Sequence, residues 1–269
     1  MPNFICITCG TQFAATDEEP AICPICEDER QYVGWIGQCW TTLEDLRREH
    51  HNVLTAEEPH LTSIVTEPAF AIGQRALLVQ TPSGNVLWDC ISLIDDATVE
   101  AVNRLGGIKA IAISHPHFYS SIVEWSRAFE DAPVLVHADD VNNLMRPDRS
   151  LLLWRGEQRE IVGGVTLARC GGHFAGSSVL HWAAGAKGRG ALLTGDTIQV
   201  VQDRRFVSFM RSYPNLIPLG AREVRRILSA VEPFAFDRIY GAWTGKVVPS
   251  SAKSALVRSA ERYLHAIAS

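Results

Sequence analysis

Two CxxC pairs near the N-terminus constrain the fold of this chain most strongly. Cys6 and Cys9 form the first pair, Cys23 and Cys26 form the second, and residues 10–22 lie between them. Each CxxC turn places two thiolates side by side, and two such turns complete a tetrahedral sulfur shell around a metal ion. A segment this short cannot bury enough apolar surface to fold alone, so metal binding would supply the missing folding free energy. The pattern predicts a four-cysteine metal site.

The metal of this four-cysteine site is predicted to be structural zinc, because the sulfur shell is closed. The spacing also resembles that of rubredoxin, in which iron occupies the four sulfurs, and Gly10 and Pro24 support that resemblance. Zinc ribbons share these features, so both metals stay open. Of the other cysteines, Cys90 and Cys170 are predicted to be core or near-surface thiols, as is Cys39, which is close enough in sequence to be a spare ligand.

Length, charge and hydropathy limit the classes of function. The 269 residues allow one large domain with a small appendage. The net charge of −5, without a basic block, gives no reason to expect nucleic acid as a partner. No apolar run is long enough to cross a bilayer, and no secretory leader is recognisable. Paired CxxC cysteines act as metal ligands in a reducing compartment, so we expect a cytoplasmic protein without a membrane partner.

The chain divides into three predicted parts. Residues 1–38 form the metal-binding segment, residues 39–60 form a linker helix, and residues 61–269 form the main body. The linker helix is predicted to start at Thr41 as N-cap, with Glu44 reaching back in a capping box. It would run towards His50 and end before the Glu57-Glu58-Pro59 break.

The main body alternates short apolar runs with amphipathic segments. Residues 76–80 and 86–89 predict a hairpin, and residues 108–113 predict a buried strand. Further strands are predicted at 134–136, 161–168, 179–183, 191–194 and 238–240, and helices at 96–105, 120–129, 222–230 and 252–267. This mixture predicts an α/β fold with helices outside the sheets.

Polar residues follow three of these strands. His115 and His117 come directly after the strand 108–113, and His173 lies in a glycine-rich turn after the strand that ends near Cys170. Asp196 follows the strand 191–194. Three imidazoles and one carboxylate are ligands typical of a catalytic zinc or iron site with room for water.

The order and spacing of these loops resemble the metallo-β-lactamase superfamily over residues 61–249. That family carries an HxHxDH motif after a strand, then a GH turn, a GD after another strand, and a late histidine. Asp89 resembles the family's early structural aspartate. The resemblance implies an αββα sandwich with the site at one edge of two packed sheets.

The chain departs from the family pattern at the ligands of the second metal. Tyr119 and Ser120 stand in place of the aspartate and the third histidine of the first motif, and Trp243 lies where the late histidine is expected. The retained ligands are those of the first metal. The resemblance therefore implies a site for one zinc or iron ion.

The first hypothesis from this site is that the chain is a metal-dependent hydrolase. Its substrate would be a small ester, thioester, amide or lactone. Asp196 would complete the ligand set or hold water as general base. Tyr119 would donate its phenol to an oxyanion in place of the lost metal, or else pack at the loop turn. The segment 206–215 would either close over the cleft or pack against the body.

Two other classes of function stay open. The chain could be a non-catalytic metal-binding relative whose cleft binds a small ligand while the zinc ribbon docks a protein partner. It could also be a rubredoxin-like redox protein, although the di-iron HxExD ligands and the flavodoxin domain of flavorubredoxins are not visible in the sequence.

Overall fold

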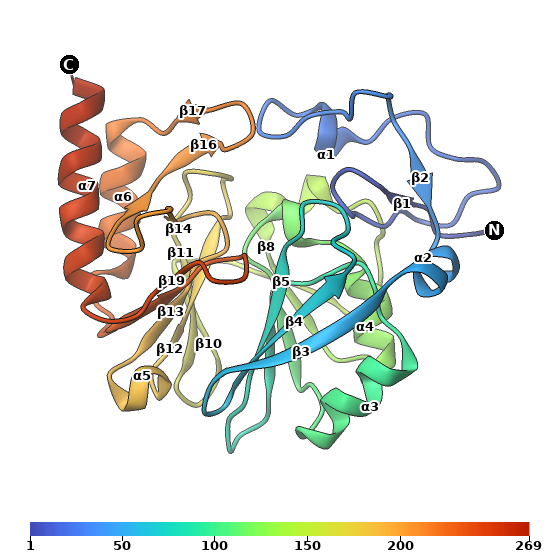
Figure 1. The fold of residues 1–269 in the computed structure, drawn as a ribbon, viewed down its shortest axis with the longest axis horizontal. Coiled ribbons are helices and arrows are strands. Elements are labelled where there is room, and N and C mark those ends of the chain that lie inside the picture. Colours follow the sequence, from blue (N-terminus) through green and yellow to red (C-terminus); the bar gives the residue numbers. More distant parts are fainter. Residues whose placement is uncertain (269) are drawn as a thin grey trace.

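The computed structural model describes residues 1–268 and shows two β-sheets face to face with helices on both outer sides (Figure 1). The first sheet has seven strands in the order of the chain: β3 (His51–Glu58), β4 (Leu61–Glu67), β5 (Arg75–Val79), β6 (Val86–Trp88), β7 (Ala110–Ala112), β8 (Val134–His137) and β9 (Leu151–Trp154). The second has six strands: β10 (Gln158–Val162), β11 (Val165–Arg169), β12 (Ser178–Trp182), β13 (Ala191–Leu193), β18 (Arg238–Tyr240) and β19 (Val247–Val248).

Three apolar layers hold this sandwich together. Strand side chains alternate between faces, so in β5 Leu77 joins the layer between the two sheets, whereas Leu78 joins the layer beneath the outer helices. Helices α3 (Asp96–Arg104) and α4 (Ile122–Ala128) cover the first sheet, and α6 (Ala221–Val231) and α7 (Ala252–Ala268) cover the second. The predicted αββα architecture is confirmed.

The N-terminal segment lies along one edge of the sandwich (Figure 1). It contains β1 (Ile5–Cys6), α1 (Pro24–Glu27) and β2 (Trp40–Thr41), and β1 pairs with β2 in antiparallel register. We call residues 1–38 the cysteine module. Its loops approach the turn between β16 (Met210–Ser212) and β17 (Ile217–Pro218), so the module contacts the second half of the sandwich.

The predicted start of the linker helix is wrong by one residue. Helix α2 (Leu43–Glu49) has Thr42 as its N-cap, whose Oγ1 accepts a hydrogen bond from the Asp45 amide at 3.2 Å. Thr41 cannot cap the helix because it pairs with Ile5 in the small sheet. Glu44 does not form the capping box but forms an ion pair with Arg48.

Two segments each contain one strand more than the sequence predicted. Residues 51–58, placed in the linker by the sequence, form the edge strand β3, which pairs with β4. The strand predicted at 161–168 is two strands, β10 and β11, because the chain turns at Gly163 and Gly164, the latter at a φ of +80° that favours glycine.

The other predicted elements are present with small shifts at their ends. The segment 206–215, expected either to close over the cleft or to pack against the body, contains β15 (Val207–Ser208), which pairs with β14 (Gln199–Val200), and β16. Short elements complete the fold: the 3-10 turns η1 (Pro116–Phe118) and η2 (Ala138–Asn143), and α5 (Gly185–Gly188). No helix within residues 1–268 is long and apolar enough to cross a membrane.

Candidate metal centre

Loops at the edge of the sandwich bring the four predicted ligands of the main body together. His115 and His117 flank the start of η1 after β7, His173 follows β11, and Asp196 follows β13. All four side chains are buried. Their ligand atoms lie within 4.8 Å of one another. We call this group of three histidines and one aspartate the His–Asp cluster.

The distances within the His–Asp cluster fit one metal ion. The His173 Nε2 atom lies 3.3 Å from His117 Nδ1, and His115 Nε2 lies 3.5 Å from Asp196 Oδ2. Zinc–nitrogen bonds of about 2.0–2.1 Å in a tetrahedron separate neighbouring ligand atoms by about 3.4 Å. These two pairs of atoms therefore have the spacing of neighbouring ligands in a tetrahedral shell.

Two histidine rings of the cluster contact oxygen atoms of other residues through Nδ1, which leaves their Nε2 atoms free to bind a metal. His173 Nδ1 contacts the Met210 carbonyl oxygen at 3.1 Å, and His115 Nδ1 contacts the Ser114 hydroxyl at 2.9 Å. Such partners orient an imidazole and leave its other nitrogen available to a metal. Within the cluster, His115 Nε2 and Asp196 Oδ1 are buried without a hydrogen-bond partner. Unpaired buried polar atoms are unfavourable, so the donor set fits a cation.

Burial also sets the protonation states that a metal requires. Desolvation lowers the pKa of His115 and of His117 well below the ordinary histidine value, and that of His173 to about 3. The imidazoles are therefore neutral at pH 7, which is the form that binds metal. Desolvation raises the pKa of Asp196 to about 6, and His173 opposes that rise.

The backbone conformation and close packing at position 195 explain why a glycine precedes Asp196. Gly195 adopts a φ of +51°, and a Cβ atom there would lie 2.5 Å from the Ser114 hydroxyl. Ser114 in turn contacts the ring of His115. The ends of β7 and β13 can therefore approach closely enough to bring His115 and Asp196 together.

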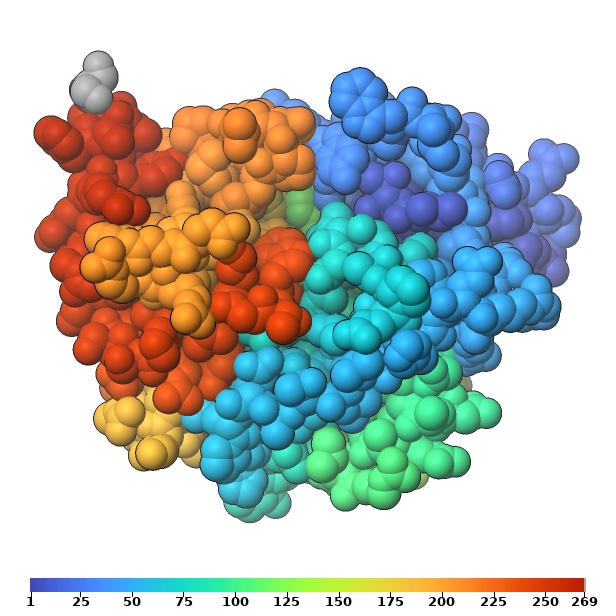
Figure 2. Space-filling model, in the orientation of Figure 1, coloured from blue at the N-terminus to red at the C-terminus, as the bar shows by residue number. Residues whose placement is uncertain are grey.

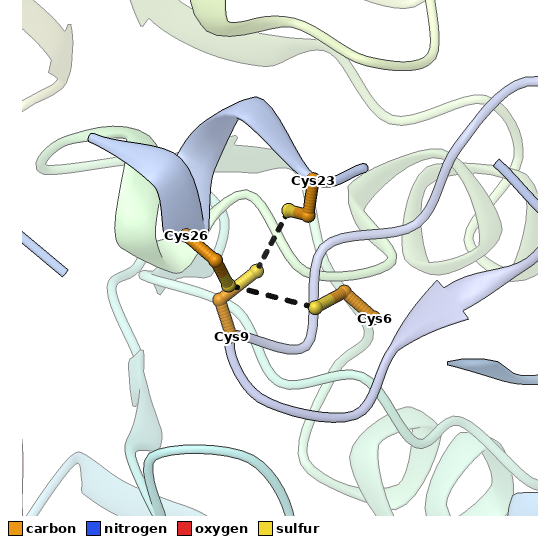
Figure 3. Close-up of side chains that lie close together, drawn as sticks. All are labelled: Cys6, Cys9, Cys23 and Cys26. Atoms are coloured by element: carbon orange, nitrogen blue, oxygen red, sulfur yellow. Dashed lines mark hydrogen bonds between the residues drawn. The ribbon is translucent and has the colours of Figure 1, made fainter. Parts of the chain in front are cut away.

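The four cysteines of the module form a second cluster (Figure 3). Cys6 Sγ lies 3.6 Å from Cys26 Sγ, and Cys9 Sγ lies 3.6 Å from Cys23 Sγ. Zinc–sulfur bonds of about 2.3 Å predict about 3.8 Å between neighbouring sulfurs. All four cysteines are buried, and apolar side chains such as Ile25 pack against them, so the arrangement fits a closed tetrahedral thiolate site.

Hydrogen bonds among the four thiols couple their protons. They lower the pKa of Cys6 and raise that of Cys9, each with Cys23 as the largest cause. A metal would replace these shared protons. Cys39 lies outside the cluster, and Cys90 and Cys170 are buried in the body, as expected for core thiols.

A cavity of about 410 Å³ opens beside the His–Asp cluster. His117, His173 and Asp196 line it together with Gln199, Tyr213 and Trp243 of the body and with Arg30, Gln31 and Tyr32 of the cysteine module. The contribution of the module was not predicted. No periodicity or motif marks residues 30–32, and their neighbours in the cavity are remote in sequence.

Named contacts fix the module against the cavity. The Arg30 guanidinium lies 3.8 Å from the ring centroid of Phe174 and donates to the His173 carbonyl oxygen at 3.3 Å. Asn215 donates from Nδ2 to the carbonyl oxygens of Glu29 and Gln31, both at 2.9 Å. Figure 2 shows the blue N-terminal surface touching the orange surface of this region.

Tyr119 and Trp243, which stand at the expected positions of second-metal ligands, both donate hydrogen bonds to main-chain oxygens. The Tyr119 hydroxyl donates to the Asp140 carbonyl oxygen at 3.1 Å and does not line the cavity. This contact supports the packing alternative, and a catalytic role for Tyr119 stays a prediction. Trp243 lines the cavity and donates from Nε1 to the Ile72 carbonyl oxygen.

Comparison with solved structures defines the class of fold. VMB-1 matches with a TM-score of 0.59 and 14% identity, over 81% of this chain and 98% of that chain. The DIM-1 metallo-β-lactamase matches with a TM-score of 0.58 and 14% identity, over 80% and 98%. FIM-1 from Pseudomonas aeruginosa, in its mono-zinc form, matches with a TM-score of 0.58 and 16% identity, over 78% and 95%. The chain has the metallo-β-lactamase fold, as the loop motifs predicted.

A sequence relative defines the family more narrowly. The chain is 52% identical to the uncharacterized protein YmaE of Bacillus subtilis (strain 168) over 269 residues, which cover 99% of this chain and 97% of that protein. The chain therefore belongs to the YmaE family. No family model matches it.

Proposed function

We propose that this chain is a metal-dependent hydrolase that uses one zinc or iron ion in the His–Asp cluster. Its substrate would be a small ester, thioester, amide or lactone. One observation carries the proposal: three of the four clustered metal-binding side chains, His117, His173 and Asp196, line a cavity of about 410 Å³. That volume falls within the range of small-molecule sites.

Three observations support a single ion in the body. Within residues 1–268, the only groups of three or more metal-binding side chains that converge are the His–Asp cluster and the four cysteines. Tyr119 and Trp243, at positions of second-metal ligands, bond to main-chain oxygens instead. FIM-1, which shares the fold, has been solved in a mono-zinc form.

The side chains around the cluster would have different roles in the proposed hydrolysis. His115, His117, His173 and Asp196 would hold a divalent ion, which would supply Lewis acidity to a carbonyl group and lower the pKa of nearby water. Asp196 Oδ1, which has no other partner, would hold the proton taken from that water. The Tyr213 hydroxyl donates to the Asp196 carbonyl oxygen at 3.0 Å and keeps that loop in place. Tyr119 would have to leave the Asp140 carbonyl oxygen to reach an oxyanion, so its catalytic role stays a prediction.

The cysteine module would bind structural zinc, because its closed sulfur shell leaves no position for substrate. Four metal-binding thiolates also fit a reducing compartment, and we place the protein in the cytoplasm on this ground.

The proposed function is tested by metal analysis and a panel of chromogenic esters, thioesters, anilides, lactones and β-lactams. We expect His115→Ala to remove one metal equivalent and to lower turnover at least about a hundredfold, a magnitude typical of losing the metal's electrostatic contribution. His51→Ala, on the exposed edge strand, is the matched control and should change neither value. Turnover that survives His115→Ala would contradict the proposal, and a full metal content without any turnover would favour the non-catalytic alternative.

A further inference from the structure

An aromatic ring packs among the three histidine ligands, and the cysteine module covers it. Phe174 is 3% exposed. The centroid of its ring lies 5.6, 5.0 and 5.2 Å from the ring centroids of the ligands His115, His117 and His173. These distances are typical of packed aromatic pairs. The Arg30 guanidinium of the module lies 3.8 Å from the same centroid, so one phenyl ring contacts the module and all three imidazoles.

The same guanidinium holds the main chain of one ligand. Arg30 Nη1 donates to the His173 carbonyl oxygen at 3.3 Å, while the His173 ring contacts the Met210 carbonyl oxygen through Nδ1. Phe174 follows His173 directly, and its amide donates to the Ser177 hydroxyl at 2.8 Å. Arg30 therefore contacts two consecutive residues of the loop between β11 and β12, at the point where this loop supplies its ligand.

The Arg30 side chain itself has a fixed direction. Asp28 accepts from Arg30 Nε and Nη2, with both N···O distances at 2.6 Å, and from the Arg30 amide at 2.9 Å. The Arg30 carbonyl oxygen accepts from the Ser212 hydroxyl at 3.1 Å. Asp28 directly follows α1, the helix that contains Cys26. A continuous path therefore runs from the four-cysteine cluster through Arg30 to His173.

These contacts depend on the shape of a guanidinium. Its planar face stacks on an aromatic ring while its N–H groups donate in the plane, and a lysine ammonium cannot do both in the same geometry. Only 16% of the Arg30 side chain is exposed, so the stack is largely shielded from water, which strengthens the attraction between cation and ring. Partners that orient a metal-binding imidazole also determine how tightly the metal is held.

We propose that Arg30 is a positioning residue of the His–Asp cluster: it stacks on Phe174 and donates to the His173 carbonyl oxygen, and so holds the ligand histidines in the arrangement that binds the metal of the body. The cysteine module then supports the affinity of a metal site outside itself. This inference rests on the proposed function, because it assumes that the His–Asp cluster binds a metal.

The test follows Co²⁺ binding to the His–Asp cluster of the full chain, with zinc kept in the cysteine module. Co²⁺ held by nitrogen and oxygen ligands absorbs visible light, and its absorption band depends on the ligand geometry. Arg30→Met keeps an apolar side chain against Phe174 but removes the charge and the donor. We expect it to weaken Co²⁺ binding by about ten- to a hundredfold, as the loss of a partner that orients a ligand does, and to shift the band.

Two further variants separate the guanidinium from its charge and from docking in general. Arg30→Lys keeps a cation beside Asp28, and its Co²⁺ affinity should fall between those of the wild type and Arg30→Met. Glu29→Gln is the interface control, because it breaks a different ion pair between module and body, that of Glu29 with Arg211. It should bind Co²⁺ as the wild type does. Mass spectrometry counts the zinc of the cysteine module in every variant.

An unchanged Co²⁺ affinity or an unchanged band in Arg30→Met overturns the inference and leaves the proposed function standing. Wild-type binding by Arg30→Lys, or an equal loss in Glu29→Gln, also overturns it. If Arg30→Met loses the zinc of the module, Arg30→Lys decides alone. A wild type that binds no Co²⁺ in the body while retaining zinc in the module contradicts the proposed function itself, and the inference with it.

Discussion

Single residues at the ends of strands determine how closely the ligands approach. Gly195 and Ser114 lie against each other where β13 and β7 end, and each is adjacent in sequence to a ligand. The sequence predicts the ligands themselves, since His115, His117, His173 and Asp196 follow apolar strands. It does not predict Gln31, because an isolated glutamine in a loop has no pattern, and only the folded chain brings it to the cavity.

Substitution of Gly195 tests this close approach. Gly195→Ala should destabilise the protein by about 1–3 kcal/mol more than Gly188→Ala, because the new Cβ would meet Ser114. Gly188 has a similar left-handed backbone, with a φ of +83°, but open space around it. Urea unfolding of both variants measures the difference. Equal stabilities would mean that the two strand ends are not in contact.

Asp140 gives a pH dependence at the residue scale. Desolvation raises its pKa to about 6, while its Oδ1 accepts from the Gly176 amide. The folded state therefore binds this proton more tightly than the unfolded state, whose carboxyl has a pKa near about 3.9. Stability from this group is full below about pH 4 and is lost as the pH rises to about 6.

Asp140→Asn should remove this loss of folding stability at higher pH, because an amide does not titrate. The variant is expected to gain stability relative to wild type between about pH 4 and pH 7, by about 1–3 kcal/mol, as denaturation at several pH values would show. If the stability advantage of Asp140→Asn over the wild type shrinks as the pH rises, the assigned protonation state of Asp140 is wrong.

At the scale of elements, the turn between β16 and β17 fixes the cysteine module. Strands with clear apolar runs were predicted well from sequence, because both faces of β5, β6 and β7 are buried. The short hairpins at residues 199–218 were not predicted, because few of their residues alternate and their stability comes from distant contacts. Thr42 rather than Thr41 caps α2 for the same kind of reason, since pairing with Ile5 takes Thr41 into a strand.

Asn215→Ala should loosen the module without removing its metal. The change deletes two hydrogen bonds to the carbonyl oxygens of Glu29 and Gln31, worth about 1–3 kcal/mol together. We expect faster hydrogen exchange in residues 29–33, with Asn142→Ala, an exposed control, unchanged. Unaltered exchange in the Asn215 variant would show that other contacts hold the module.

At the scale of the whole molecule, one sandwich edge carries both predicted metal clusters and the cavity beside one of them. The αββα architecture follows from the sequence, because alternating apolar strands and amphipathic helices have few other ways to bury their faces. The docking of the cysteine module onto this edge does not follow, because it depends on contacts such as Arg211 with Glu29, which are 182 residues apart. The cysteine module and the body therefore meet at one edge of the sandwich, beside the cavity.

Metal stoichiometry of the full chain tests the central claim most directly. Mass spectrometry of purified protein should find two metal ions per chain, with His115→Ala and Cys23→Ala each losing one and the double variant losing both. Three ions in the wild type, or a metal content unchanged by His115→Ala, would contradict a single-ion His–Asp site beside a four-cysteine site.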